Sequence, residues 1–237
     1  MPDVAPERTR PVVCRDVTRT YRQGGSRLSR RGGRAVTALA GVSLAIEQGE
    51  TVGIAGPSGS GKSTLLHLLA GLDTPTSGTV HIDGEDTQAL SGRKRTQLRL
   101  TRVGLVFQRF YLLPSLSARA NVALPLLEQG VSRRARRERA TDLLEQVGLA
   151  DRADHRPSEL SGGEQQRVAV ARALASDPAI VIADEPTGEL DTETGEQVLD
   201  VLAATSEDRA VVIASHDERA LARTDRVIRL LDGERVA

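Results

Sequence analysis

Aliphatic runs alternate with short polar stretches along the chain, and their periods predict the order of strands and helices. Residues 11–55 contain three β-rich stretches, VVCRDVTRTY, VTALAGVSLAI and TVGIA, separated by a Gly/Ser/Arg-rich stretch that is expected to form an exposed loop. Beyond Ser63, leucines recur with the spacing of one helix face, at Leu65, Leu68, Leu69 and Leu72. Gly71 and Pro75 are expected to end that helix.

The second half of the chain is expected to mix helices with buried strands. A short strand is expected around GTVHIDG, followed by a polar segment and VGLVFQRFYLLP, and residues 117–155 are expected to be wholly helical. Two aliphatic runs, AIVIADEP and AVVIASHD, end in polar residues, which is typical of parallel strands that are buried on both faces. Functional groups are then expected at the carboxyl ends of these strands. The tail DRVIRLLDGERVA is expected to form a closing hairpin.

Length and charge limit the classes of protein to consider. The 237 residues suffice for one large domain or for one domain with a sizeable subdomain. Because the formal net charge is zero, nothing predicts binding to nucleic acid. The longest apolar runs, such as AIVIA, are far shorter than the roughly 18 residues of a spanning helix. Cys14 is the only cysteine and no signal peptide is evident, so a cytoplasmic location is expected.

Lysines and aromatic residues are scarce, which draws attention to the few that occur. Among 32 Lys and Arg residues, only Lys62 and Lys94 are lysines. Genome base composition explains the bias, but the compact ammonium of Lys62 stands out against it. The chain has two Tyr and two Phe residues, so aliphatic side chains must fill most of the core. Apart from Tyr21, the aromatic residues cluster at Phe107, Phe110 and Tyr111.

The stretch GPSGSGKST lies between a predicted strand and a predicted helix and matches the pattern of a phosphate-binding loop. Its glycines let backbone N–H groups converge on phosphates, and the start of the helix adds its positive dipole end. Lys62 is expected to reach the β- and γ-phosphates, and Ser63 to offer its hydroxyl to Mg²⁺. The alternative is a flexible Gly/Ser loop, but the pattern should arise by chance in roughly two of a thousand such sequences. The residues expected to bind ATP or GTP are Gly56, Pro57, Ser58, Gly59, Ser60, Gly61, Lys62, Ser63 and Thr64.

Two adjacent carboxylates end the predicted strand IVIADEP. Neighbouring strand residues point to opposite sides unless the chain turns, and Pro186 predicts such a turn. Asp184 is expected to hold Mg²⁺, and Glu185 to orient and deprotonate the attacking water. The alternative is an ordinary strand-end turn with its acids in solvent, which the nearby phosphate loop disfavours.

A second possible anion site occurs at LSGGEQQ, residues 160–166. Two glycines at the mouth of a helix leave N–H groups that favour an anion. Taken alone, such a stretch is more often a helix N-cap with a tight turn.

The motifs GPSGSGKST, VFQ, LSGGEQQRVAVARAL, VIADEP, GELD and ASHD occur in an order that resembles the nucleotide-binding subunit of ATP-binding cassette (ABC) transporters. The resemblance extends from about Tyr21 onward. It implies an α/β fold: a P-loop NTPase core with a mixed, mainly parallel sheet, an N-terminal antiparallel β subdomain and an inserted helical subdomain. The implied boundaries are one ABC ATPase domain at 11–237, a helical subdomain at about 110–165, a flexible N-terminus at 1–10 and an exposed Arg/Gly loop at 22–35.

The resemblance also implies ATP hydrolysis with Mg²⁺ in a head-to-tail homodimer. The signature stretch of each chain closes over the ATP held by the other, so the second cradle serves the partner chain. Ser161, Gly162 and Gly163 match the positions that contact the opposite γ-phosphate. Asp191 in GELD matches the aspartate that links the two sites, although Glu189 stands where a small or amide residue is common.

Three further residues receive roles from the resemblance. Gln108 matches the glutamine that joins the core to the helical subdomain and senses Mg²⁺ and the attacking water. His216 matches the switch histidine at the γ-phosphate, although a lone strand-end histidine is more often structural. Tyr21 matches the aromatic that stacks on adenine, and its alternative is a half-buried strand tyrosine.

VGLVFQRFYLLPSLSARANVALPLL resembles the ATPases of the lipoprotein-release, macrolide-export and cell-division branch, with Ala120 departing from the usual acidic residue. In that branch a short helix of a multi-spanning permease docks here, near Phe110 and Tyr111, which implies a peripheral location on the inner face of the cell membrane. The alternative is local packing by Phe107 and Phe110. The arginines of the 22–35 loop could contact anionic lipid, but a solvated loop is the more economical interpretation.

Other classes remain to be weighed against this reading. An importer ATPase has the same chemistry and is the main alternative. DNA-repair or chromosome-structuring relatives carry a long coiled coil or zinc cysteines between the phosphate loop and the signature, and this chain has neither. Translation-type ATPases carry two cassettes, and this chain has one. The transported molecule is not encoded in these motifs, because the membrane partner supplies its pocket.

Overall fold

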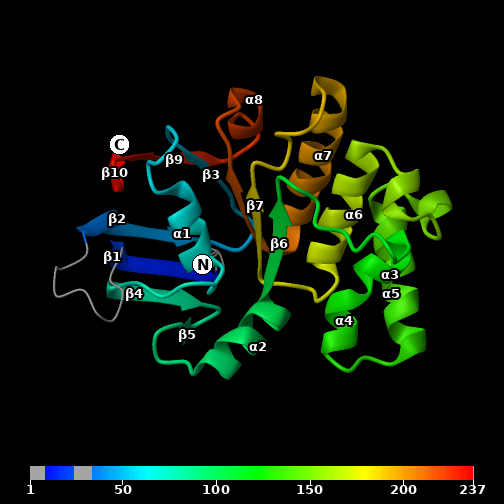
Figure 1. The fold of residues 1–237 in the computed structure, drawn as a ribbon, viewed down its shortest axis with the longest axis horizontal. Coiled ribbons are helices and arrows are strands. Elements are labelled where there is room, and N and C mark those ends of the chain that lie inside the picture. Colours follow the sequence, from blue (N-terminus) through cyan, green and yellow to red (C-terminus); the bar gives the residue numbers. More distant parts are fainter. Residues whose placement is uncertain (1–8, 24–33, 237) are drawn as a thin grey trace, which may run out of the picture.

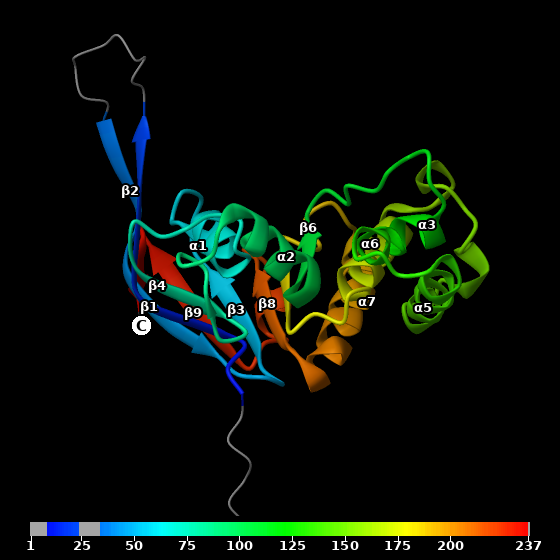
Figure 2. The same ribbon diagram turned by 90° about the horizontal axis from the view of Figure 1, so that it is seen from below.

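The computed structural model describes residues 9–23 and 34–236, which form two sheets with helices around them (Figures 1 and 2). Most of the predicted flexible N-terminus and of the predicted Arg/Gly loop lies outside the described residues. The flanking strands extend to Gln23 and from Arg34, so the interval between them is narrower than the predicted 22–35.

One sheet is antiparallel and lies at the left of Figure 1. Its strands are ordered β2-β1-β4-β5. β1 and β2 are long, and irregular pairing near Cys14 and Val17 lets them bend around the core. The predicted antiparallel β subdomain is therefore confirmed, with longer strands than the sequence indicated. The bounds are β1 Val12–Gln23, β2 Arg34–Ile46, β4 Ser77–Ile82 and β5 Glu85–Asp86.

The other sheet has the order β10-β9-β3-β8-β7-β6 and is parallel except for β10. Both faces are buried, because alternate residues of β8 join two separate apolar clusters: Val212 in one, Val211 and Ile213 in the other. The predicted closing hairpin is confirmed by β9 and β10. The bounds are β3 Thr51–Ala55, β6 Val103–Phe107, β7 Ile180–Asp184, β8 Ala210–Ala214, β9 Arg226–Leu231 and β10 Glu234–Val236.

Helices cover both faces of the parallel sheet. α1 contacts strands of both sheets, whereas α6 and α7 pack together on the other face. α3, α4 and α5 lie beyond α6, at the end of the molecule opposite the antiparallel sheet (Figures 1 and 2). The bounds are α1 Lys62–Leu69, α3 Ala118–Val122, α4 Leu124–Glu128, α5 Arg133–Gln146, α6 Gly162–Leu174, α7 Thr192–Ala204, α8 Glu218–Leu221, and the 3₁₀ turns η1 Ala150–Arg152, η2 Pro157–Glu159 and η3 Thr205–Asp208.

Three helical details differ from the predictions. Residues 117–155 are not one continuous helical run, because turns divide them into α3, α4, α5 and η1. The polar segment before β6 forms a helix, α2 (Gly92–Arg102), which buries only Leu98 and is capped by the Ser91 side chain. α1 ends at Leu69, so Leu72 lies outside it and is 45% exposed, while Leu66 joins the buried face.

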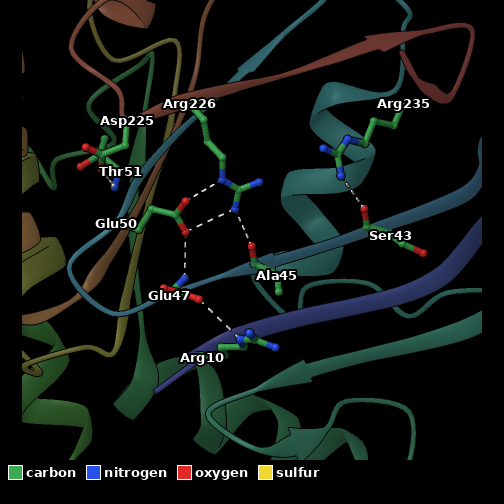
Figure 3. A network of polar contacts seen from close by, with 9 residues as sticks. All are labelled: Arg10, Ser43, Ala45, Glu47, Glu50, Thr51, Asp225, Arg226 and Arg235. Atoms are coloured by element: carbon green, nitrogen blue, oxygen red, sulfur yellow. Dashed lines mark hydrogen bonds and ion pairs between the residues drawn. The ribbon is translucent and has the colours of Figure 1, made fainter. Parts of the chain in front are cut away.

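A polar network joins the two sheets at the amino ends of β3 and β9 (Figure 3). The Arg226 guanidinium donates to the Glu50 carboxylate and to the carbonyl oxygen of Ala45, the second-last residue of β2. The hydrogen bond to Glu50 raises the pKa of Arg226, and burial opposes it. Asp225 accepts from the Thr51 N–H at 2.7 Å. These contacts fix the strand ends that lie farthest from the predicted catalytic groups.

Candidate active site

A cavity of about 580 Å³ opens at the carboxyl ends of the parallel strands. Its lining includes four segments of the chain: the phosphate loop, the segment with Gln108, the segment with Asp184 and Glu185, and the segment with His216. A larger cavity, of about 780 Å³, lies between α5, α7 and η3 at the amino ends of β7 and β8. We assign the active site to the smaller cavity, because it contains the predicted catalytic groups and the other contains none of them. The loop residues lining it are Gly56, Pro57, Ser58, Gly59, Gly61, Lys62, Ser63 and Thr64.

The phosphate loop leads directly into α1, whose amino end carries no side-chain cap. Gly61 is the N-cap residue, with φ of 102°, and no acidic side chain lies in the first turn. A Cβ atom at Gly61 would approach the carbonyl oxygen of Ala38 to 2.5 Å, so only glycine permits this path. The first N–H groups of α1 are consequently available to an anion.

The cationic side chain of Lys62 folds back onto the phosphate loop. Lys62 Nζ donates to the carbonyl oxygens of Gly56 (2.7 Å) and Pro57 (3.1 Å). Ser60 is 2% exposed, and its hydroxyl has no hydrogen-bond partner among the described residues. Ser60 does not line the cavity, so the ammonium group and the open N–H groups form the donor set that fits a polyphosphate.

Two carboxylates meet at the end of β7, as predicted. Asp184 is the last strand residue, and Glu185 turns the chain with φ of 47°, a left-handed conformation that is rare for a residue with a side chain. Glu185 accepts from Ser215 Oγ at 3.1 Å through Oε2, and its Oε1 lies 2.9 Å from His216 Nδ1. The Glu185 carboxylate is thus held by the two residues that follow β8.

Burial raises the pKa of Asp184, and the adjacent charge of Glu185 raises it further, while His67 and Lys62 oppose the shift. A divalent cation beside Asp184 would offset both causes. The hydroxyl of Ser63, the carboxylate of Asp184 and the amide oxygen of Gln108 are donor types that suit Mg²⁺ beside phosphate oxygens, and their role as ligands stays a prediction. Within residues 9–23 and 34–236, no cluster of three or more His, Cys, Asp or Glu residues could hold a metal ion.

Gln108 follows β6 directly and lies against the turn after Glu185. A Cβ atom at Gly188 would be 3.1 Å from Gln108 Nε2, so the amide side chain packs on that backbone. Next to it, Arg109 forms an ion pair with Glu189 at 3.8 Å, with both side chains substantially exposed. The segment after β6 is therefore in contact with the segment that carries the catalytic carboxylates.

The signature residues do not reach this cavity. Ser161 is the N-cap of α6: its Oγ accepts from the Glu164 N–H at 3.2 Å, and Glu164 Oε2 accepts from the Ser161 N–H at 2.8 Å. These two bonds form a capping box. The bond from the Ser161 N–H is the largest cause of the lowered pKa of Glu164, and Arg152 adds to it.

Asp191 lies beside the signature stretch, outside the cavity. It caps α7 by accepting from the Thr194 N–H at 3.0 Å, and this bond lowers its pKa. A Cβ atom at Gly163 would overlap the Thr194 methyl group. The two predicted interface motifs of one chain thus form a single packed surface.

Tyr21 is not among the residues that line the cavity. Its hydroxyl donates to Asp73 at 2.9 Å, and the Arg19 guanidinium lies 4.5 Å from the centre of its ring. One face of the ring is therefore already in use. Adenine stacking by Tyr21 stays a prediction.

Sequence reasoning missed two functional contacts. The ASHD motif predicts no role for Ser215, yet its hydroxyl donates to Glu185, and its place directly after a buried strand is the sequence signal for that contact. Arg172 donates to the carbonyl oxygens of Tyr111 (2.6 Å) and Phe110 (2.8 Å), which ties α6 to the aromatic segment. No local pattern indicates that long-range contact.

Comparisons with known proteins agree on one family. Residues 39–188 match the model of the family described as ABC transporter. The chain is 48% identical to a lipoprotein-releasing system ATP-binding protein, LolD, of Novosphingobium aromaticivorans, covering 94% of this chain and 97% of the relative. It is 49% identical to a macrolide export ATP-binding/permease protein, MacB, of Rhodopseudomonas palustris, covering 87% of this chain and 32% of that longer protein.

A solved structure matches the fold as well. The ATP-binding cassette MJ0796, in a dimeric post-hydrolysis state bound to ADP and Pi, superposes with a TM-score of 0.84 and 42% identity. The match covers 95% of this chain and 97% of that one. The predicted α/β fold class is thereby confirmed.

Proposed function

Because this chain belongs to the ABC transporter family, we propose that it hydrolyses Mg²⁺-bound ATP in the 580 Å³ cavity and transmits the resulting movement to a membrane permease. The chain is an ATP-hydrolysing subunit of an ABC transporter. The observation that carries the site assignment is the convergence of an uncapped helix start, Lys62 and Glu185 on one cavity.

The residues of the site divide the work of hydrolysis. Lys62 and the N–H groups at the start of α1 hold the β- and γ-phosphates. Glu185 orients the attacking water and accepts its proton, while Ser215 and His216 hold one carboxylate oxygen each. Mg²⁺, held by Ser63, Asp184 and Gln108, would neutralise the charge on the phosphate oxygens.

A second copy of the chain completes each site. Ser161, Gly162 and Gly163 lie outside their own cavity, and the N–H groups of both glycines lack a partner in the preceding turn. We assign them to the γ-phosphate of the nucleotide on the partner chain. Asp191, which packs beside them through Thr194, then carries contacts between the two sites.

The permease is proposed to dock in a groove of about 440 Å³ between α2, β6, α4 and α6. Phe107 and Tyr111 line it, their rings in edge-to-face contact at 5.4 Å, and Tyr111 is 64% exposed. Phe110 instead approaches Gly162, so the two predicted anchors face different neighbours. Tyr111 is the anchor for the permease, and Phe110 connects this segment to the signature helix.

None of the helices in the described part of the chain is long and apolar enough to cross a membrane. We place the chain at the inner face of the cell membrane, attached through this groove. The export and mechanotransmission branch is favoured over an importer, because LolD and MacB match nearly the whole chain at 48–49% identity.

Enzyme assays test the activity directly. The purified chain should hydrolyse ATP only with Mg²⁺, and the rate per chain should rise with protein concentration, because the active unit is a dimer. Lys62→Ala should abolish turnover while the chain stays folded. Hydrolysis that continues without Mg²⁺ or in Lys62→Ala would contradict the assignment.

Docking is tested by truncating the aromatic anchors. Tyr111→Ala should keep ATP affinity and basal hydrolysis but lose co-purification with the membrane subunit and coupled transport, since such an anchor is worth about 2 kcal/mol or more. Adding Phe110→Ala should also disturb the signature helix, because Phe110 approaches Gly162. Leu231→Ala, which truncates another exposed apolar side chain (48%) outside the groove, is the control. Full membrane association of Tyr111→Ala would exclude this docking site.

A further inference from the structure

The groove proposed for the permease has an unbalanced charge. Its lining includes the arginines Arg99 from α2 and Arg172 from α6, and no Asp or Glu. The remaining walls are largely apolar, with Leu100, Leu105 and Phe107 among them. A groove that accepted a purely apolar helix would have little reason to contain two cations.

Neither arginine has a carboxylate partner in the part of the chain that the structure describes. Arg99 donates from Nη1 to the Gly71 carbonyl oxygen and from Nη2 to Thr96 Oγ1, both at 2.9 Å. Arg172 donates to the carbonyl oxygens of Phe110 and Tyr111. These neutral acceptors fix the orientation of each guanidinium but leave its charge uncompensated.

Partial burial makes that charge costly. Burial lowers the pKa of Arg172, and burial followed by the charge of Arg95 lowers the pKa of Arg99. A docked helix would remove more water from both groups, and a desolvated cation is tolerated only when an opposite charge reaches it. The occupant that suits the groove therefore carries negative charge.

A neighbouring arginine shows that the chain pairs such groups elsewhere. Arg102, near the end of the same helix, forms an ion pair with Asp83 at 3.0 Å, and it does not line the groove. Arg102 is therefore a matched control on the same helix, because its charge is compensated and it lies outside the groove.

We propose that the groove receives an amphipathic segment of the membrane subunit that carries at least one Asp or Glu facing Arg99 and Arg172. This inference rests on the proposed docking function. Apolar residues of the segment pack on Phe107 and Leu100, and its carboxylate pairs with the two guanidinium groups. The pairing selects a permease with an acidic residue at one position and opposes a permease with a cation there.

Charge substitutions at Arg99 test the pairing. Arg99→Glu should lower co-purification with the membrane subunit about tenfold or more, Arg99→Gln should lower it less, and Arg102→Gln should leave it unchanged. ATP affinity of the isolated chain should be unaltered in all three, which shows that they are folded. Replacing the facing Asp or Glu of the membrane subunit by Arg should restore the complex with Arg99→Glu.

The possible outcomes separate this inference from the docking proposal. If Arg99→Glu associates normally while Tyr111→Ala releases the membrane subunit, the groove is a docking site and the charge inference is wrong. If neither variant affects association, the docking proposal fails. Should the wild-type chain alone bind phosphatidylglycerol vesicles and Arg99→Glu lose that binding, the anion is a lipid headgroup and the acidic segment is excluded. Loss of association in Arg102→Gln as well would also overturn the inference.

Discussion

The starts of α1 and α6 are both candidates for phosphate contact, yet their chemistry differs. α1 begins at Gly61 without a side-chain cap or an acidic residue in its first turn. α6 begins with a complete capping box between Ser161 and Glu164, and the Glu164 carboxylate lies in the first turn. The N–H groups of Gly162 and Gly163 and the O–H of Ser161, which only accepts in the capping box, are left for an external ligand there.

The difference indicates two binding strengths. An uncapped helix start beside Lys62 gains several hydrogen bonds and a charge contact from a nucleotide, so it can bind one within a single chain. The start of α6 is already satisfied in part, and its acidic side chain opposes an anion. It is suited to add contacts to a nucleotide that the partner chain already holds.

Removing the catalytic base gives the largest expected effect. Glu185→Gln should leave nucleotide binding intact and slow hydrolysis by about two to four orders of magnitude. If the start of α6 acts only on the partner's nucleotide, the slowed variant should accumulate as an ATP-bound dimer on size-exclusion chromatography. Hydrolysis near the wild-type rate, or a purely monomeric variant, would contradict the assigned roles.

Substitutions at the starts of α1 and α6 should affect different steps, ATP binding by the monomer and ATP-driven dimerisation. Lys62→Ala removes a charge-assisted contact and should weaken monomer ATP affinity about 10- to 150-fold. Ser161→Arg should spare that affinity but prevent ATP-driven dimerisation and turnover.

Two experiments make this separation decisive. Mixing the two variants should restore dimers with one intact composite site. Ser91→Arg, which disrupts the N-cap of α2, controls for loss of a cap. Weakened monomer affinity in Ser161→Arg would mean that the signature stretch serves its own chain.

The capping box of α6 should make a smaller, pH-dependent contribution. Because the folded-state pKa of Glu164 is lowered, its stabilisation is present above the unfolded pKa of about 4.3 and is lost as pH falls through the folded pKa. Glu164→Gln should cost about 0.5–1 kcal/mol near neutral pH. The difference from wild type should vanish in strong acid, as followed by urea unfolding. A pH-independent difference would indicate a packing effect.

The ion pair of Arg109 with Glu189 should have the smallest effect. Both side chains are substantially exposed, and such pairs contribute about 0–1 kcal/mol. Glu189→Gln should change unfolding free energy by less than about 0.5 kcal/mol and leave the turnover rate within about threefold. The Hill coefficient for ATP is the sensitive readout, because the pair joins the segment after Gln108 to the segment before Asp191. An unchanged coefficient would remove Glu189 from communication between sites.

The strands, and the position of the carboxylates proposed for catalysis, were predictable because their signals are local. AIVIADEP and AVVIASHD are continuous aliphatic runs, and both became fully enclosed strands with polar residues at their ends. The helix α2 was not predicted, since its single buried residue, Leu98, gives no periodic pattern. Its cap at Ser91 was the only available signal.

Contacts between distant segments explain the remaining misses. Phe110 and Tyr111 are adjacent in sequence, but the backbone of Tyr111 is left-handed (φ 46°). Phe110 approaches Gly162, whereas Tyr111 lines the groove. The contact of Tyr21 with Asp73 and that of Arg172 with the aromatic segment join residues far apart in sequence. No periodicity encodes such pairs.

The left-handed backbone of Glu185 sets the stability of the chain against its ATP turnover. A left-handed conformation costs a residue with a side chain about 1–2 kcal/mol, whereas glycine adopts it freely. Glycine at this position would therefore relax the chain and at the same time remove the proposed catalytic base. Selection for thermal stability alone would therefore favour glycine at position 185, which would give a more stable but inactive protein. A glutamate that persists here under such selection is evidence that the organism still needs turnover.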